Sequence, residues 1–195
     1  MTTATNSVQQ AQKDQLNALL DRRPIVLVGM MGAGKTTVGR RLAARLGRHF
    51  VDSDEEVEKA AGMTIEDIFK TRGEADFRAG EVKVIARLLK EPDLVLGTGG
   101  GAFMNADTRE MVKSLAVSVW IKADFELLFQ RVQRRSNRPL LKTANPRQTL
   151  KDLIDKRYPT YAGADVTIVS KDVPQDQVAG EVVEALLAHF RSPHV

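Results

Sequence analysis

The sequence predicts an α/β fold of three layers, in which helices cover both faces of a five-stranded parallel sheet. Two observations support this class. Short apolar runs alternate with longer segments whose apolar residues recur every three to four positions. The run Ile25–Val28 leads directly into Gly29-Met-Met-Gly-Ala-Gly34-Lys35-Thr36-Thr37, a glycine-rich pattern that joins a buried strand to a helix and binds phosphate.

A single domain accounts for the length of 195 residues, and we find no internal repeat. Residues 23–195 are expected to form this domain. Residues 1–22 are polar and are expected to be an extension, with at most a short helix through Leu16, Leu19 and Leu20. Because no segment resembles a secretory signal or a membrane span of about 20 apolar residues, we expect a cytoplasmic protein without a membrane partner.

The composition narrows the classes of ligand. The net charge of +4 favours small anionic ligands. Aromatic residues make up only 5% of the chain and are not interleaved with a basic run, which argues against nucleic acid as a partner. The absence of cysteine excludes disulfides and thiolate metal sites. A monomer is the simplest expectation.

The apolar periodicity and the turn residues place the elements in order. Five strands are predicted, at Pro24–Val28, His49–Asp52, Leu94–Leu96, Val117–Ile121 and Val166–Val169. Two helices are predicted to end at Gly47 and near Ala60, and a third to begin at a capping box in Thr64–Asp67. Two more are predicted at Glu74–Lys90 and Asp107–Ser114. Of the last three helices, one follows a cap at Asp124, one ends near Tyr161, and the final one aligns Val178, Val182, Leu186 and Phe190 on one face.

Residues 134–147 have a different character. Arg134, Arg135, Arg138, Lys142 and Arg147 stand there among Asn, Pro and Ser, with little apolar periodicity. This composition predicts a loop, and its charge suggests a mobile lid over phosphates.

Three polar or glycine-rich segments follow three of the predicted strands. They are the phosphate-binding loop, the pair Asp52 and Asp54, and Gly99–Gly101. Ligands of open parallel sheets bind beyond the carboxyl ends of the strands, so these segments are expected to meet at one edge. In the loop, Lys35 would reach the terminal phosphates and Thr36 would place its hydroxyl on Mg²⁺.

The two carboxylates can divide the work of phosphoryl transfer. One could hold Mg²⁺ through water, while the other could accept a hydrogen bond from the hydroxyl that is phosphorylated. Turn formation or helix capping is the alternative interpretation. The third strand does not end in the Asp of an ordinary Walker B motif, so Asp52 is the nearest candidate for metal support.

Other candidates remain open on the pattern alone. Arg78 and Glu81 are one helical turn apart, and spacing alone favours a surface ion pair. Arg138 and Arg157 could each clamp an anionic substrate or be solvated. Gly99–Gly101 lets the backbone approach a ligand closely, with a structural turn as the alternative.

Taken together, these residues resemble the shikimate kinase family. The motifs G-x-x-G-x-G-K-T-T, D-S-D, G-E-x-x-F-R-x-x-E, T-G-G-G, R-P-L and R-x-x-x-Y occur in this order over about residues 24–170. Many proteins share the first motif, whereas the other five at these separations are specific. The resemblance implies the P-loop fold of nucleoside monophosphate kinases, with ATP and Mg²⁺ as cofactors. It also implies transfer of the γ-phosphoryl group of ATP to the 3-hydroxyl of shikimate, in the route to chorismate and the aromatic amino acids.

The resemblance also implies residue roles. Lys35, Asp54 and Arg138 would be catalytic, with Asp54 as base or orienting group and Arg138 as the lid arginine. Thr36 and, through water, Asp52 would support Mg²⁺. ATP would contact Gly32, Ala33, Gly34, Lys35, Thr36, Thr37, Arg131 and Arg138, with Arg131 near adenine. Shikimate would contact Asp54, Phe69, Phe77, Arg78, Glu81, Gly99, Gly100, Gly101, Leu140 and Arg157, within a substrate-binding region of about residues 52–90 and the lid.

Within this set, Arg78, held by Glu81, and Arg157 would grip the substrate carboxylate. Phe69, Phe77 and Leu140 would form apolar walls. The chain has Gly163 where family members often have Glu, and Lys171–Pro174 matches the adenine loop only loosely. Two alternatives are another small-molecule P-loop kinase, for gluconate or nucleotides, and a non-catalytic nucleotide-binding module that regulates a partner.

Overall fold

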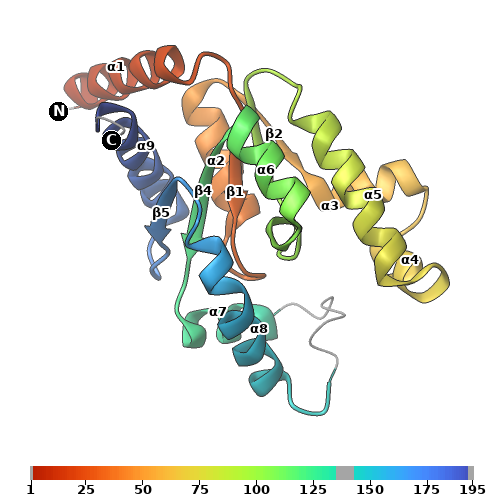
Figure 1. Cartoon of the computed structure of the whole chain (residues 1–195). Coiled ribbons are helices and arrows are strands. Elements are labelled where there is room, and N and C mark those ends of the chain that lie inside the picture. Colours follow the sequence, from red (N-terminus) through yellow and green to blue (C-terminus); the bar gives the residue numbers. More distant parts are fainter. Residues whose placement is uncertain (1, 135–142, 193–195) are drawn as a thin grey trace.

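The structure is a computed structural model that describes residues 2–134 and 143–192 (Figure 1). Its strands form one parallel sheet in the order β2-β3-β1-β4-β5. They are β1 (Ile25–Val28), β2 (His49–Asp52), β3 (Leu94–Gly97), β4 (Val117–Lys122) and β5 (Val166–Val169). The predicted five-stranded parallel sheet is therefore confirmed, with bounds that agree to within one residue.

The positions of β1 and β5 in the sheet explain their patterns of burial. β1 lies in the centre, and all four of its residues are buried because helices cover both faces. β5 lies at an edge, where Val166 and Ile168 are buried while Thr167 and Val169 are exposed. Burial is continuous along β1 in the centre and alternates along β5 at the edge.

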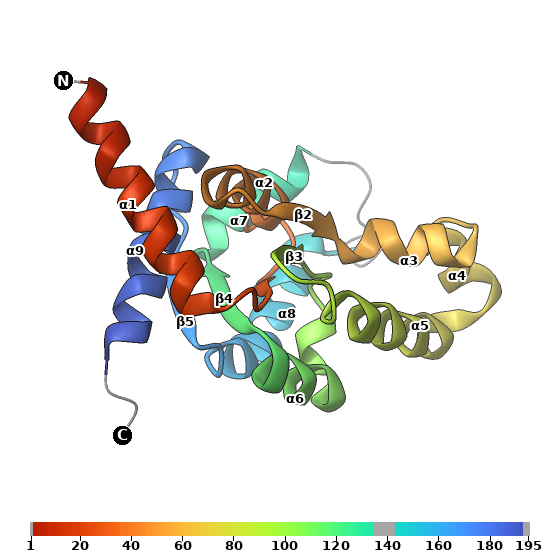
Figure 2. The same cartoon turned by 90° about the horizontal axis from the view of Figure 1, so that it is seen from above.

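Helices cover both faces of the sheet, as Figure 2 shows. α2 and α9 lie on one face, with α1 beside them, and α6 lies on the opposite face, while α3, α4 and α5 extend outward beyond β2. The helices are α1 (Thr2–Leu20), α2 (Lys35–Leu46), α3 (Ser53–Ala61), α4 (Ile65–Thr71), α5 (Gly73–Leu88), the short 3₁₀ helix η1 (Ala102–Met104), α6 (Ala106–Leu115), α7 (Phe125–Gln133), α8 (Pro146–Tyr161) and α9 (Gln175–Arg191).

The predicted helix ends are confirmed where a capping residue was recognised. Thr64 accepts a hydrogen bond from the Asp67 amide, and Asp124 accepts one from the Leu127 amide. Gly47 ends α2 in the left-handed conformation, which glycine adopts without steric cost. Local capping chemistry thus sets these bounds.

The N-terminal segment differs from the expectation. A helix through Leu16, Leu19 and Leu20 is present, but it begins at Thr2, so the expected short length is wrong. Its C-terminal part is tied to the rest of the fold: Leu16 and Leu20 are fully buried, and the Asn17 side-chain amide donates to the Leu46 carbonyl over 2.9 Å. Packing fixes this end, and the helix continues toward its N-terminus through the good helix formers Gln9–Lys13.

The predicted lid also has a corrected boundary. Asn145 accepts a hydrogen bond from the Gln148 amide and so caps α8, with Pro146 in its first turn. Pro146 and Arg147 are therefore helical rather than part of the loop. Arg138 and Leu140 lie outside the described residues.

Across the described ranges, no helix is both long and apolar enough to cross a membrane.

Candidate functional site

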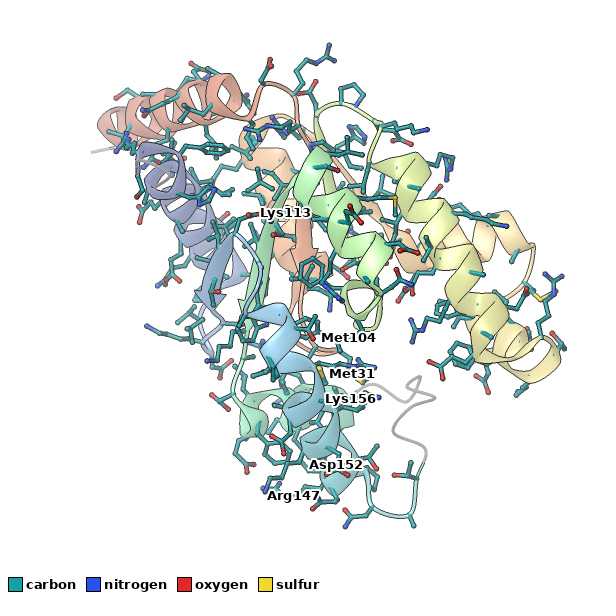
Figure 3. The ribbon with its side chains drawn as sticks, viewed as in Figure 1. Met31, Met104, Lys113, Arg147, Asp152 and Lys156 are labelled. Carbon is teal, nitrogen blue, oxygen red and sulfur yellow. The ribbon has the colours of Figure 1, made fainter. Side chains whose placement is uncertain are left out.

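A cavity of about 860 Å³ lies where the segments after β1, β2 and β3 meet. The prediction that these strand ends share one edge is confirmed. Of the sequence-predicted residues, the lining includes Gly32, Gly34, Lys35, Thr36, Thr37, Asp52, Asp54, Gly99, Gly100 and Arg131. Figure 3 labels Met31, another lining residue, below the sheet, and Arg147 on α8.

The phosphate-binding loop turns tightly between β1 and α2. Gly34 has a φ of 102° and precedes the first residue of α2, so the helix N-terminus faces the cavity. The Lys35 ammonium donates to the Gly29 carbonyl over 2.8 Å and to the Met30 carbonyl over 2.9 Å. Ala33 is fully buried, and its amide donates to the Met30 carbonyl over 3.2 Å. The loop is thus held by its own backbone and by Lys35.

Asp52 connects the phosphate-binding loop to the end of β2. The Thr36 hydroxyl donates to Asp52 Oδ2 over 3.0 Å. Asp52 Oδ1 accepts from the Asp54 amide over 3.1 Å, which caps α3. The capping interpretation of Asp52 is therefore confirmed for one oxygen, while the other oxygen lies beside Thr36.

This pair of oxygen-bearing side chains fits Mg²⁺. Mg²⁺ takes oxygen ligands and usually combines one or two protein groups with waters and substrate phosphates. Within residues 2–134 and 143–192, no group of three or more His, Cys, Asp or Glu could hold a metal ion. A cation beside Thr36 and Asp52 would take its other oxygens from water and a bound phosphate.

Asp54 lies against the glycine-rich loop that follows β3. The buried Ser53 hydroxyl oxygen accepts a hydrogen bond from the Gly99 amide over 3.1 Å, which joins the two loops. A Cβ placed on Gly99 would lie 2.6 Å from Asp54 Oδ1 and 2.8 Å from Glu81 Oε1. A side chain at position 99 would therefore displace one or both of these carboxylates.

The predicted pair of Arg78 and Glu81 forms, with Nη1 and Oε2 2.7 Å apart. A surface ion pair is wrong as a description, because the Glu81 side chain is only 2% exposed. Burial raises the pKa of Glu81, although the Arg78 guanidinium opposes this rise. Burial alone would lower the pKa of Arg78, but the charges and hydrogen bonds of Glu81 and Glu74 raise it on balance.

Two guanidinium groups flank the same glycine loop. A Cβ on Gly101 would lie 2.5 Å from Arg78 Nη1, and a Cβ on Gly100 would lie 3.2 Å from Arg157 Nη1. Arg157 is 7% exposed and donates to the Gly100 carbonyl over 3.1 Å, so a solvated Arg157 is excluded. Both cations therefore adjoin the loop Gly99–Gly101, and the Asp54 carboxylate lies near the same loop.

The aromatic candidates lie beside this region rather than in the cavity lining. Phe69 and Phe77 have ring centroids 5.0 Å apart, and Phe77 is buried. The Arg78 guanidinium lies 4.9 Å from the Phe77 ring centroid. Among the described residues, Ala33, Phe69, Phe77, Arg78, Glu81, Gly101 and Arg157 are not part of the lining.

Arg131 joins the phosphate-binding loop to the segment after β5. Its Nη1 donates to the Gly32 carbonyl over 3.4 Å and to the Ser170 hydroxyl over 3.2 Å. Its Nη2 donates to the Lys171 carbonyl over 3.2 Å. The structure thus places Arg131 beside Lys171–Pro174, the segment compared above with the adenine loop.

Sequence reasoning missed several lining residues. Gln175 begins α9, and a Cβ on Gly34 would lie 2.8 Å from its Oε1. Its place beyond the carboxyl end of β5 is a signal that could have found it. The lining also includes Glu55, Glu58, Thr64, Ile65, Glu66, Thr98 and Arg134.

A model of the shikimate kinase family matches residues 31–187. The chain belongs to the shikimate kinase family. A shikimate kinase of Bradyrhizobium diazoefficiens is 51% identical over 190 residues, which are 97% of this chain and 92% of that protein. One from Rhodopseudomonas palustris is 53% identical over 175 residues, which are 90% of this chain and 86% of that protein.

Solved structures agree with membership of the shikimate kinase family. The shikimate kinase from Acinetobacter baumannii in complex with shikimate is 42% identical, with a TM-score of 0.85, over 91% of this chain and 99% of that one. A gluconokinase from Sinorhizobium meliloti 1021 is 18% identical with a TM-score of 0.53, over 87% of this chain and 91% of that one. At that identity the likeness extends to the fold alone.

Proposed function

We propose that this protein transfers the γ-phosphoryl group of ATP to the 3-hydroxyl of shikimate, a step toward chorismate and the aromatic amino acids. One observation carries the proposal: Arg157 lies beside Gly100 and Arg78 lies beside Gly101. Asp54 is close to the same glycine loop, at the edge of the sheet where the phosphate-binding loop also lies. The acceptor region thus offers two cations to a carboxylate and one carboxylate to a hydroxyl. A 42% identical relative was solved in complex with shikimate.

The donor side would bind MgATP. The amides at the N-terminus of α2, with Gly32, Gly34 and Thr37, would bind the phosphates, while Lys35 would exchange its two carbonyl partners for phosphate oxygens. Thr36 and, through water, Asp52 would hold Mg²⁺, which offsets phosphate charge during transfer. Arg131 would lie near the adenine ring.

The acceptor side would orient the attacking hydroxyl. Asp54 would accept its hydrogen bond and act as base or orienting group, while the bond from this oxygen to the γ-phosphorus forms and the bond from that phosphorus to the ADP oxygen breaks. Arg78, fixed by Glu81, and Arg157 would bind the carboxylate of shikimate, and the amides around Gly100 and Gly101 would add hydrogen bonds beside Gly99.

Other roles remain proposals at the positions named from the family resemblance. Phe69, Phe77 and Leu140 would form apolar walls, and Arg138 would close over the transferred phosphoryl group. Closure of the lid would exclude water, which otherwise competes as acceptor. We also propose that the protein is a cytoplasmic monomer. Light scattering of the protein as it elutes from a size-exclusion column measures its mass directly and so tests the monomer.

A coupled ADP-release assay tests the proposal with shikimate, gluconate and nucleoside monophosphates compared at equal concentrations. We expect turnover with shikimate to exceed the others by at least about a hundredfold, because its ring fixes the distance between its carboxylate and its hydroxyls, whereas gluconate is an open chain and a nucleoside monophosphate has no carboxylate. Turnover with gluconate or a nucleotide alone would favour another small-molecule kinase. ATP binding without transfer to any acceptor would favour the regulatory module.

A further inference from the structure

Tyr161 has a position that its motif alone does not explain. It ends α8 and is fully buried, although its hydroxyl is polar. That hydroxyl donates to the Gly100 carbonyl and lies 3.9 Å from Met30 Sδ. Tyr161 therefore contacts both the glycine loop after β3 and the phosphate-binding loop.

The Gly100 carbonyl is shared between two donors. Arg157 Nη1 donates to it over 3.1 Å, and the Tyr161 hydroxyl is the second donor. A carbonyl oxygen has two lone pairs, so the two donors use its full capacity. Arg157 and Tyr161 both belong to α8, which places both donors on one rigid element.

Gly100 also lies close to the phosphate-binding loop. A Cβ on Gly100 would lie 3.5 Å from the Gly29 carbonyl oxygen and 3.6 Å from the Met31 nitrogen. Gly100 thus adjoins both the phosphate-binding loop and α8. Any rotation of its carbonyl would move the group that fixes Arg157 Nη1.

The tyrosine remains a donor under all ordinary conditions. Burial raises its pKa to about 12, although the Arg157 charge opposes this rise. The Trp120 ring centroid lies 6.0 Å from that of Tyr161, and the Tyr158 ring centroid 6.3 Å from it. The ring therefore packs in an aromatic cluster that would retain it after loss of the hydroxyl.

We propose that Tyr161 is a positioning residue for the acceptor: by sharing the Gly100 carbonyl, it fixes this peptide and the guanidinium of Arg157. This inference rests on the proposed binding of shikimate by Arg157. It assigns Tyr161 no contact with shikimate. Its effect acts through the arrangement of the carboxylate clamp. Because the contact of its hydroxyl with Met30 Sδ is long, at 3.9 Å, we expect the phosphate chemistry at Lys35 and Thr36 to change little.

The substitution Tyr161→Phe tests this role, and Tyr158→Phe is a matched control. The Tyr158 hydroxyl also donates to a backbone carbonyl, that of Ala123, from the same helix. Each substitution removes one hydroxyl and keeps the ring. Since one hydrogen bond is a small part of the total stability, both variants should fold and show similar decreases in melting temperature.

Steady-state kinetics should then separate the two variants. We expect Tyr161→Phe to raise the KM for shikimate about three- to tenfold, since a positioning hydrogen bond is lost. We expect kcat and the KM for ATP to stay within about twofold, and Tyr158→Phe to leave all three constants within that range. Titration of the Trp120 fluorescence with shikimate measures binding directly, because the chain has a single tryptophan.

A double-mutant cycle tests the shared carbonyl. If Arg157 and Tyr161 act through one group, the effects of Arg157→Lys and Tyr161→Phe on the KM for shikimate will not multiply in the double variant. Multiplying effects would overturn the proposal, as would an unchanged KM in Tyr161→Phe or an equal rise in Tyr158→Phe. Absence of shikimate turnover in the unmodified protein would overturn the proposed function and this inference together. The three results for the variants would overturn the role of Tyr161 and leave the proposed function intact.

Discussion

The buried carboxylate of Glu81 holds the guanidinium of Arg78 through a charged hydrogen bond of 2.7 Å, whereas Glu74 contacts the same guanidinium from the protein surface at 3.2 Å. The side chain of Glu81 is 2% exposed and that of Glu74 is 59% exposed. The two partners of one arginine thus differ in solvation, and they should differ in their effect on it.

We predict that Glu81→Gln raises the KM for shikimate about tenfold, because a neutral amide holds the charged Arg78 less firmly than a carboxylate does. Glu74→Gln is the control and should change this KM by less than about twofold, since exposed ion pairs contribute little. Steady-state kinetics measure both. Equal effects of the two substitutions would contradict the assigned role of Glu81.

Asp54→Asn should lower kcat at least about a hundredfold, since the amide cannot accept the proton of the attacking hydroxyl. ATP binding, measured by calorimetry, should remain. Glu55 is a suitable comparison because it lines the same cavity and its side chain is 57% exposed. Glu55→Gln should keep kcat within about threefold, since it has no part in proton transfer. Near-normal turnover of Asp54→Asn would rule out its role.

The helix α1 should contribute to stability through its C-terminal part. Leu16→Ala should lower the free energy of unfolding by about 2–4 kcal/mol, because Leu16 is fully buried and the change leaves a cavity. Val8→Ala on the same helix should cost less than about 0.5 kcal/mol, because Val8 is 58% exposed. Urea unfolding measures both. A negligible cost for Leu16→Ala would show that α1 is not packed as described.

Tyr161 should also affect stability at alkaline pH. Burial raises its pKa in the folded protein from 10.0 to about 12, so the folded state resists ionisation of this group. A raised pKa contributes stability that is present below pH 10 and is lost as the pH rises toward about 12. The stability advantage of the unmodified protein over Tyr161→Phe should therefore shrink over this range. Denaturant unfolding at several pH values measures it, and a constant difference would contradict the burial of an ionisable hydroxyl.

Local chemistry was sufficient to predict much of the fold. The strands at His49–Asp52 and Val166–Val169 are predicted to the residue, because apolar runs and turn residues bound them. The phosphate-binding loop is likewise contained in one continuous segment. The cap at Asp124 is predicted because its partner amide lies only three residues away, at Leu127.

Features that depend on distant partners were not predictable. Residues 2–15 have no apolar stripe, and the burial of Leu16 and Leu20 that anchors α1 depends on its packing with α2 and α9. Spacing could pair Arg78 with Glu81 but could not show that Glu81 is buried. The bond from Tyr161 to Gly100 joins residues 61 positions apart, and no local pattern encodes it.

Phosphorus NMR of a reaction mixture that contains the unmodified protein, MgATP and shikimate tests the proposed phosphoryl transfer most directly. We expect ADP and shikimate 3-phosphate to appear in equal amounts, with the new phosphorus resonance coupled to the proton on carbon 3. ADP formation no faster than in the mixture without shikimate, or a phosphoryl group on another oxygen, would contradict the proposed transfer.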